Sequence, residues 1–275
     1  MAFCVIEYLG GQVSGSLALI ADAGHMLGDM SALGIAFFAS WIAVRRPTHK
    51  MTYGFYRVEV LAALINAALL LTIAVGLSRE AWERFSTQRE IQSSLMIVIA
   101  VTGLAINGVV GAMLLRHRRD NINVGAAFYH VVSDALSSIG TVIAGIVVQT
   151  TGWYWADPMA SLVIAIMIAF SAWRLLKSVV SVLLEASPAH IDTVQMNARV
   201  LAIPGVEAIH DLHVWSISPG KESLSAHVEV KEGCDRDRIL HEVCDLLSRE
   251  FNVSHTTLQI EQAKKTRHNE NHFHS

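Results

Sequence analysis

The stretch VGAAFYHVVSDALSSIGTVIAGIVVQT, residues 124–150, is long and apolar enough to cross a lipid bilayer as one helix. A helix rises about 1.5 Å per residue and the hydrocarbon core is roughly 30 Å thick, so about 20 apolar residues suffice. The only ionisable side chains in this stretch are Tyr129, His130 and Asp134. A histidine and an aspartate four residues apart need an explanation here, because ionisable groups inside a membrane are costly and mark ion or proton sites.

Four other segments have the same length and character, which predicts further membrane-spanning helices at 16–44, 58–78, 92–115 and 158–183. The opening stretch 1–12 is apolar too, but as a helix it reaches only about 18 Å, so we expect a shortened first helix or a re-entrant segment. Of the 275 residues, 52% are hydrophobic and 16% charged, with a mean hydropathy of +0.41. This composition is too apolar for an ordinary soluble domain and predicts an α-helical membrane protein.

Charged residues are concentrated near the end of the chain, where the last third holds about half of the Asp, Glu, Lys and Arg residues. We therefore expect a transmembrane domain over residues 1–185, followed by a water-soluble part. The loops 45–57 and 116–123 are rich in Arg and Lys, which favours a cytoplasmic position for both. Alternation of the helices then puts residue 184 onward in the cytoplasm.

The water-soluble part, residues 186–263, has helical and strand patterns that predict a small αββαβ domain. We expect its elements, in order, near 190–202, 203–217, 224–230, 235–250 and 256–262. The final segment KKTRHNENHFHS, residues 264–275, is polar, and its composition predicts a disordered, histidine-containing tail.

Several function classes are disfavoured by the sequence. The three cysteines form no CxxC pair, so neither a disulfide framework nor a Cys-rich zinc module is indicated. A net charge of −3 and a pI near 6.5 argue against a nucleic-acid-binding protein, which would carry a basic face. The helical HExxH motif of membrane zinc proteases is absent, since HEVCD at 241–245 lacks the second histidine. We therefore expect no enzymatic activity.

The segment HMLGD repeats, with His25 and Asp29, the spacing of His130 and Asp134. Positions i and i+4 share one helix face, so each helix presents two ligands side by side. A divalent cation between the helices would offset the cost of burying these groups, and a tetrahedral set of two imidazoles and two carboxylates suits zinc. The alternatives are a private hydrogen bond within each helix, or a proton relay without metal.

Two more aspartates lie in the apolar segments or at their ends. Asp22 is one turn from His25, which makes it a candidate partner or entrance ligand of the same site. Asp157 precedes Pro158 at the start of a helix, a position that is typical of an N-cap.

At these residues the chain resembles the cation diffusion facilitator family, particularly its zinc-exporting branch. The resemblance rests on five segments: SGSLALIADAGHMLGD (14–29), TYGFYRVEVLAALINA (52–67), FYHVVSDALSSIG (128–140), ADPMASL (156–162) and IHDLHVWSI (209–217). It implies a six-helix membrane domain, a cytoplasmic metallochaperone-like αββαβ domain, a homodimer, and exchange of zinc for protons. By this resemblance the transport ligands are His25, Asp29, His130 and Asp134, and the histidine at the first position favours zinc.

The resemblance also implies a zinc site in the cytoplasmic domain at His210, His227 and Glu261, whereas the residues alone are equally compatible with solvent-facing strand positions. The short loop RHRRDNINV, residues 116–124, is poor in histidine, which favours a bacterial protein of the inner membrane. Protonation of imidazole and carboxylate competes with zinc, so protons are the natural driving ion. The remaining alternatives are a carrier of Co, Cd, Fe or Mn, and a metal sensor that transports nothing.

Overall fold

The computed structural model describes residues 2–87, 89–118 and 122–263; the segment 264–275, expected to be a disordered tail, lies outside the described residues. Its contacts divide the chain into two compact units. The first unit combines Met1–Phe38 with Ala62–Leu176, and the second combines Ala39–Leu61 with Lys177–Ser275.

Five helices are long and apolar enough to span a membrane, which confirms the five predicted segments. They are α2 (Leu17–Ala43), α3 (Arg57–Ser86), α4 (Ser93–Leu115), α5 (Ile122–Thr151) and α6 (Ala156–Leu183). Their outward faces carry large apolar side chains such as Phe37, 79% exposed, and Trp82, 75% exposed. Exposed apolar surface of this extent suits lipid rather than water.

The opening stretch forms a separate short helix, α1 (Ala2–Ser14), of 13 residues. It packs against α4, where a Cβ atom at Gly10 would overlap the side chain of Ile99, so the close approach depends on glycine. The chain then reverses direction at Gly15, which has a φ of 75°, and enters α2.

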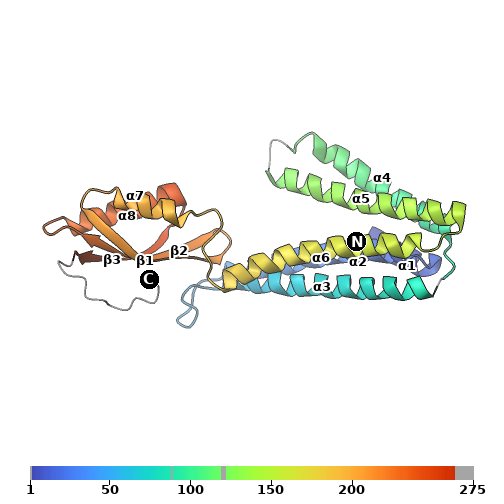
Figure 1. Ribbon diagram of the computed structural model, residues 1–275, viewed down its shortest axis with the longest axis horizontal. Coiled ribbons are helices and arrows are strands. Elements are labelled where there is room, and N and C mark those ends of the chain that lie inside the picture. Colours follow the sequence, from blue (N-terminus) through green and yellow to red (C-terminus); the bar gives the residue numbers. More distant parts are fainter. Residues whose placement is uncertain (1, 88, 119–121, 264–275) are drawn as a thin grey trace. The chain divides into compact units, whose positions relative to one another are not determined.

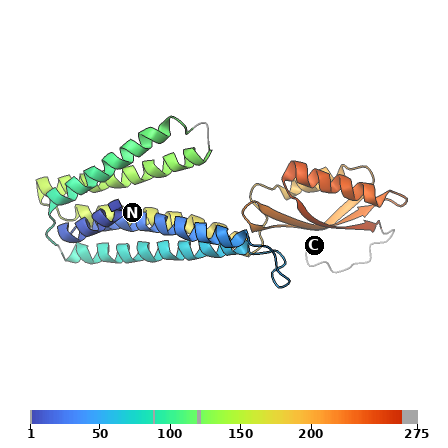
Figure 2. The same ribbon diagram turned by 180° about the vertical axis from the view of Figure 1, so that it is seen from behind.

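The first unit has two apolar clusters, and α2 contributes to both. Helices α2, α3 and α6 meet around Leu17, Ala74 and Ile168, while α2, α4 and α5 meet around Leu19 and Met96. Figures 1 and 2 show α4 and α5 side by side along their lengths. Helix α2 therefore lies between the two groups of helices.

The rest of the chain folds in the predicted αββαβ order. Its elements are α7 (Thr193–Leu201), β1 (Val206–Ser218), β2 (Lys221–Val230), α8 (Arg236–Phe251) and β3 (His255–Gln262). The sheet order is β1-β2-β3, with β1 and β2 antiparallel and β2 and β3 parallel. Helices α7 and α8 cover one face of the sheet (Figure 1) and bury Met196, Val228 and Leu247 against it.

Candidate metal centre

The four predicted membrane ligands lie together between α2 and α5. Asp29 Oδ2 lies 3.7 Å from His25 Nδ1 on its own helix and 3.5 Å from His130 Nε2 on α5. Asp134 Oδ1 lies 3.5 Å from His25 Nε2, and its Oδ2 lies 3.6 Å from His130 Nε2. Each carboxylate thus faces both histidines. We call these four residues the membrane tetrad.

The distances in the membrane tetrad are longer than good hydrogen bonds, which fall near 2.9 Å. They lie near the separation of roughly 3.3–3.6 Å expected between ligand atoms about 2.0–2.2 Å from a tetrahedral zinc ion. His25 faces Asp29 through Nδ1 and Asp134 through Nε2, and an imidazole binds one ion through one nitrogen, so a shared ion would keep only one of these two approaches. His25 Nδ1 and Asp134 Oδ1 are buried without a hydrogen-bond partner in the described part of the chain. The potential ligand atoms of His25, Asp29 and Asp134 lie within 4.8 Å of one another.

His130 is the loosest member of the membrane tetrad. Its ring centroid lies 6.3 Å from that of His25, and its side chain is 49% exposed, compared with 16% for His25. The potential ligand atoms that lie within 4.8 Å of one another accordingly come from His25, Asp29 and Asp134, without His130.

Asp22 links α2 to α5 one turn from the membrane tetrad. It is 4% exposed, and its carboxylate accepts hydrogen bonds from the hydroxyls of Ser137, at 2.7 Å, and Ser138, at 3.3 Å. Ser137 follows Asp134 by three residues, so these bonds hold the facing turns of the two helices together. This contact is consistent with Asp22 as a supporting partner of the site.

Asp157 caps a helix, but the helix is α2 rather than its own helix α6. It is fully buried, and it accepts hydrogen bonds from the hydroxyl of Ser16 at 2.6 Å and the backbone N–H of Leu17 at 2.7 Å. The first N–H groups of a helix have no intrahelical partner, and their end of the helix carries partial positive charge. A carboxylate from α6 therefore fixes the start of the helix that carries His25.

Arg84 adds a third helix to this contact. Its guanidinium donates to the carbonyl oxygen of Gly15 at 2.5 Å and lies 3.9 Å from Asp157 Oδ2. Glu80, one turn earlier on α3, accepts a further bond from Arg84 at 2.9 Å. The start of α2 is thus attached to both α3 and α6.

The three residues expected to form a cytoplasmic zinc site also lie close together, on the sheet face opposite the helices. His210 and His227 are direct cross-strand partners with ring centroids 5.0 Å apart. Glu261 Oε1 lies 2.9 Å from His227 Nδ1, and its Oε2 lies 3.8 Å from His210 Nε2. Imidazoles and carboxylates at these distances are a donor set that zinc accepts.

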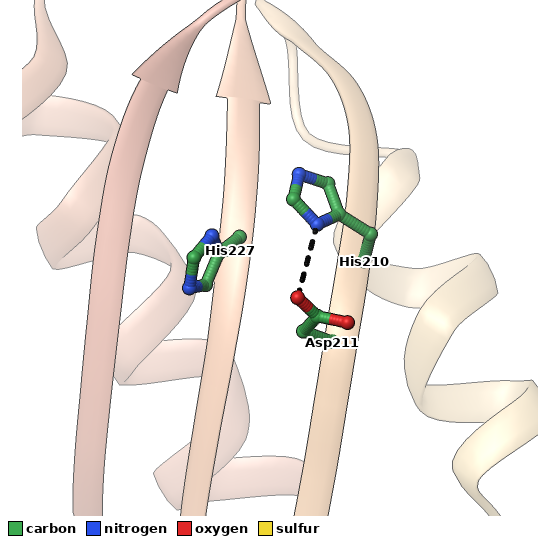
Figure 3. A group of neighbouring side chains, drawn as sticks. All are labelled: His210, Asp211 and His227. Carbon is green, nitrogen blue, oxygen red and sulfur yellow. Dashed lines mark ion pairs between the residues drawn. The ribbon is translucent and has the colours of Figure 1, made fainter. Parts of the chain in front are cut away.

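Two further carboxylates join this group. Glu229 Oε1 lies 3.5 Å from His210 Nε2, and Asp211 Oδ2 lies 3.7 Å from His210 Nδ1 (Figure 3). We call His210, Asp211, His227, Glu229 and Glu261 the sheet cluster. Its side chains are 20–33% exposed, so an ion could reach them from solvent.

A β-bulge explains why the sequence did not predict Asp211. Successive strand residues point to opposite faces, so His210 and Asp211 should diverge. The register between β1 and β2 shifts between His210 and His213, and Asp211 has a φ of 48°. This irregularity turns Asp211 to the face of His210. Glu229, in contrast, could have been predicted from the sequence, because residues two positions apart in a strand lie on the same face of the sheet, as His227 and Glu229 do.

Comparison with known proteins agrees with this architecture. Residues 1–184 match the family model described as the cation efflux transmembrane domain, and residues 188–263 match the one described as the cation efflux protein cytoplasmic domain. The chain belongs to the cation efflux family. It is accordingly an integral membrane protein with a cytoplasmic C-terminal domain.

Relatives in the cation efflux family are similar over nearly the whole chain. The metal cation efflux system protein CzcD of Cupriavidus metallidurans is 40% identical over 262 residues, covering 95% of this chain and 83% of the relative. The zinc transporter ZitB of Escherichia coli is 40% identical, covering 94% and 83%. The cadmium, cobalt and zinc/H(+)-K(+) antiporter of Bacillus subtilis is 36% identical, covering 94% and 85%.

One of the similar solved structures is that of a single domain. It is the metal-bound C-terminal domain of the CzcD transporter from Cupriavidus metallidurans, which is 35% identical. The match covers 26% of this chain and 99% of that domain, with a TM-score of 0.25.

Proposed function

We propose that this cation efflux protein exports Zn²⁺ from the cytoplasm in exchange for protons, with the membrane tetrad as its transport site. The observation that carries the proposal is that each aspartate faces both histidines at 3.5–3.7 Å, which gathers two imidazoles and two carboxylates between the two helices. Two ionised carboxylates and two neutral imidazoles also balance the charge of a divalent cation, which lowers the cost of holding it inside a membrane.

The geometry supports release as well as binding, because each helix supplies one histidine and one aspartate. Separation of α2 from α5 divides the ligand set in half, and two ligands hold zinc far less tightly than four. Protons assist in this step, since protonated imidazole and neutral carboxyl no longer bind the metal. Uptake of protons on the outer side thus expels zinc, and their loss on the cytoplasmic side restores the site.

Zinc is the proposed substrate because two imidazoles with two carboxylates match its ligand preference. One relative is named for zinc alone and another for cadmium, cobalt and zinc, so the second candidate function is a carrier of several divalent ions. A metal sensor is the third candidate, and it differs from both carriers in moving no ion across the membrane.

We also propose that the domain 1–185 carries the ion and that the domain 186–263 binds zinc at His210, His227 and Glu261. The protein then acts as a homodimer, in which zinc at the sheet cluster affects transport only if it binds one conformation better than the other. The name of the family model for residues 188–263, which refers to a zinc-transporter dimer, supports the homodimer.

The deciding experiment is zinc uptake into proteoliposomes with an imposed pH gradient. We expect Asp134→Ala to abolish the flux and His25→Asp to alter the preference among Zn, Cd, Co and Mn. The matched control is Glu83→Ala, which removes an exposed carboxylate from the end of α3. If Asp134→Ala and His25→Asp both moved zinc like the wild type, the four-ligand site would be wrong.

A further inference from the structure

Hydrogen bonds join α2 to α5 at a level next to the membrane tetrad. The carboxylate of Asp22 accepts from Ser137 at 2.7 Å and from Ser138 at 3.3 Å, and each of these residues is at most 5% exposed. Asp22 lies three residues before the tetrad histidine of α2, and Ser137 lies three residues after the tetrad aspartate of α5. The contact is therefore about one helical turn from the tetrad on both helices.

The start of α2 marks the outer side of the membrane. The cytoplasmic domain follows the end of α6, so α6 begins on the outer side. Asp157 at that beginning accepts from the backbone N–H of Leu17, which places the first residue of α2 on the same side. Helix α5 ends just before α6 begins, so its end is outer as well. The hydrogen bonds of Asp22 thus lie between the tetrad and the outer surface.

Exposure of the side chains falls along both helices in the outward direction. On α5 it falls from 49% at His130 to 18% at Asp134, and Thr141 further out is fully buried. On α2 the side chain of Asp29 is 32% exposed, whereas Asp22 is buried. The tetrad is therefore closed by protein on its outer side and more open on its cytoplasmic side.

Apolar packing continues this closure further out. Leu19 of α2 and Ala144 and Val148 of α5 belong to one buried cluster. Apolar side chains close the space without any polar group, whereas a buried carboxylate has to be compensated by hydrogen bonds. Ionisable residues inside a membrane mark ion and proton paths. The contact of Asp22 with two hydroxyls therefore needs a role besides packing.

We propose that Asp22, Ser137 and Ser138 form the outer gate of the transport path, which their hydrogen bonds close in this structure. This inference rests on the proposed zinc transport. Zinc enters the tetrad from the cytoplasm while the gate is closed. Its release outward requires α2 and α5 to separate at this level, which breaks both hydrogen bonds. Asp22 is thus a positioning residue that holds the two helices in the arrangement open to the cytoplasm.

The strength of the gate sets the balance between the two arrangements of the helices. The net contribution of one such hydrogen bond corresponds to about tenfold in an equilibrium constant. Loss of the serine hydroxyls should therefore increase access to the path from outside. The four tetrad residues themselves stay unchanged, so their affinity for zinc should be kept.

The test measures access from outside by labelling a cysteine at position 141, which is fully buried about one turn beyond the gate. The parent chain carries Thr141→Cys, and its three natural cysteines are replaced by serine. Right-side-out vesicles are treated, without zinc, with a maleimide that cannot cross the membrane. We expect slow labelling of the parent and about tenfold faster labelling after Ser137→Ala and Ser138→Ala. Asp22→Ala should have the same effect, because it removes the shared acceptor.

The matched control is Ser161→Ala, which removes a buried hydroxyl that donates to the backbone of its own helix α6. This variant should be labelled as slowly as the parent. Equal labelling of the parent and the double serine variant would overturn the inference. Fast labelling of the parent would also overturn it, because the outer side would then be open already.

Zinc binding distinguishes a gate from a support of the ligands. It is measured in detergent on chains that keep Thr141 and carry His210→Ala and His227→Ala, which removes the sheet cluster. We expect Ser137→Ala with Ser138→Ala to leave the zinc affinity unchanged.

A loss of zinc affinity in the double serine variant would show that the hydroxyls support the tetrad, and would overturn the gate. The proposed transport site fails by a different result, zinc flux that survives Asp134→Ala. The labelling is measured without zinc, so the two failures are distinguishable.

Discussion

The membrane tetrad and the sheet cluster hold similar side chains, histidines with carboxylates, in frameworks that differ in how they can move. The tetrad is divided between two helices, and each helix keeps one histidine and one aspartate when they separate. The sheet cluster lies on three strands joined by backbone hydrogen bonds. The ligands in the membrane can therefore be parted, whereas those on the sheet stay together.

Charge separates the two sites as well. In the proposed transport site two aspartates balance one divalent ion, whereas the sheet cluster has three carboxylates around its two histidines. A neutral complex suits a hydrocarbon environment, and an excess of negative charge is tolerable in water. We therefore propose that an ion passes through the membrane tetrad and is retained at the sheet cluster.

The largest expected effect is on zinc flux and compares one carboxylate from each site. We expect Asp29→Ala to lower the flux about 100-fold or more, because even supporting residues of metal sites are worth 10–100-fold. Glu261→Ala should retain most of the flux. Uptake into inverted vesicles measures both. Equal losses of zinc flux in Asp29→Ala and Glu261→Ala would contradict the proposal that only the membrane tetrad carries the transported ion.

The next effect is on stability, and it compares the loss of a helix cap in each of the two units. Asp157→Ala removes charged hydrogen bonds from the buried start of α2 and should cost about 3 kcal/mol. Asp235→Ala removes the exposed cap of α8, where it accepts from the N–H of Arg238, and should cost about 1 kcal/mol. Thermal unfolding in detergent compares the two. A smaller loss for Asp157→Ala than for Asp235→Ala would contradict its role at α2.

A third measurement tests retention on the sheet. His227→Ala should weaken zinc binding by the sheet cluster about tenfold or more, as expected for loss of a ligand. His241→Ala is the control, because His241 lies on α8 and contacts the carbonyl of Asp237 instead. Zinc titration of both variants in the Asp134→Ala background isolates this site. Identical zinc affinities of the two variants would show that His227 is not a ligand of the sheet cluster.

The smallest expected effect is a pH dependence in the cytoplasmic domain. A hydrogen bond from Arg199 on α7 lowers the pKa of Glu250 on α8 below its ordinary value. A lowered pKa in the folded state stabilises the fold above the pKa of the unfolded chain, and this contribution disappears as pH falls through the folded pKa.

Glu250→Gln should therefore lower the unfolding temperature slightly at pH 7 and have no effect in strong acid. Thermal scans of both proteins from pH 7 to pH 3 measure the difference. A difference that grew toward acid pH would have the wrong sign and would contradict the Arg199–Glu250 pair.

The sequence predicted the parts of the molecule that follow from regular geometry. The five membrane segments and the αββαβ order were correct because hydrophobic length and periodicity determine them locally. His25 and Asp29 could be paired by helical spacing alone. Which face of α2 meets which face of α5 depends on packing, so the contacts of Asp22 with Ser137 and Ser138 appeared only in the structure.

Other features were missed for definite physical reasons. Asp211 joins the sheet cluster through a bulge, which breaks the two-residue alternation that sequence reasoning assumes. Asp157 was placed correctly at a helix start, but the helix that it caps is α2, whose first residue lies 140 residues earlier in the chain.

The cap of α2 by Asp157 has a consequence for biosynthesis. Ribosomes deliver α2 to the membrane long before α6, so the first N–H groups of α2 have to wait for the carboxylate that completes them. The start of α2, the helix that bears His25, can therefore form its hydrogen bonds to Asp157 only after α6 has been inserted. A chain arrested before residue 157 would already contain all four residues of the membrane tetrad. It would still lack the carboxylate that fixes the start of α2.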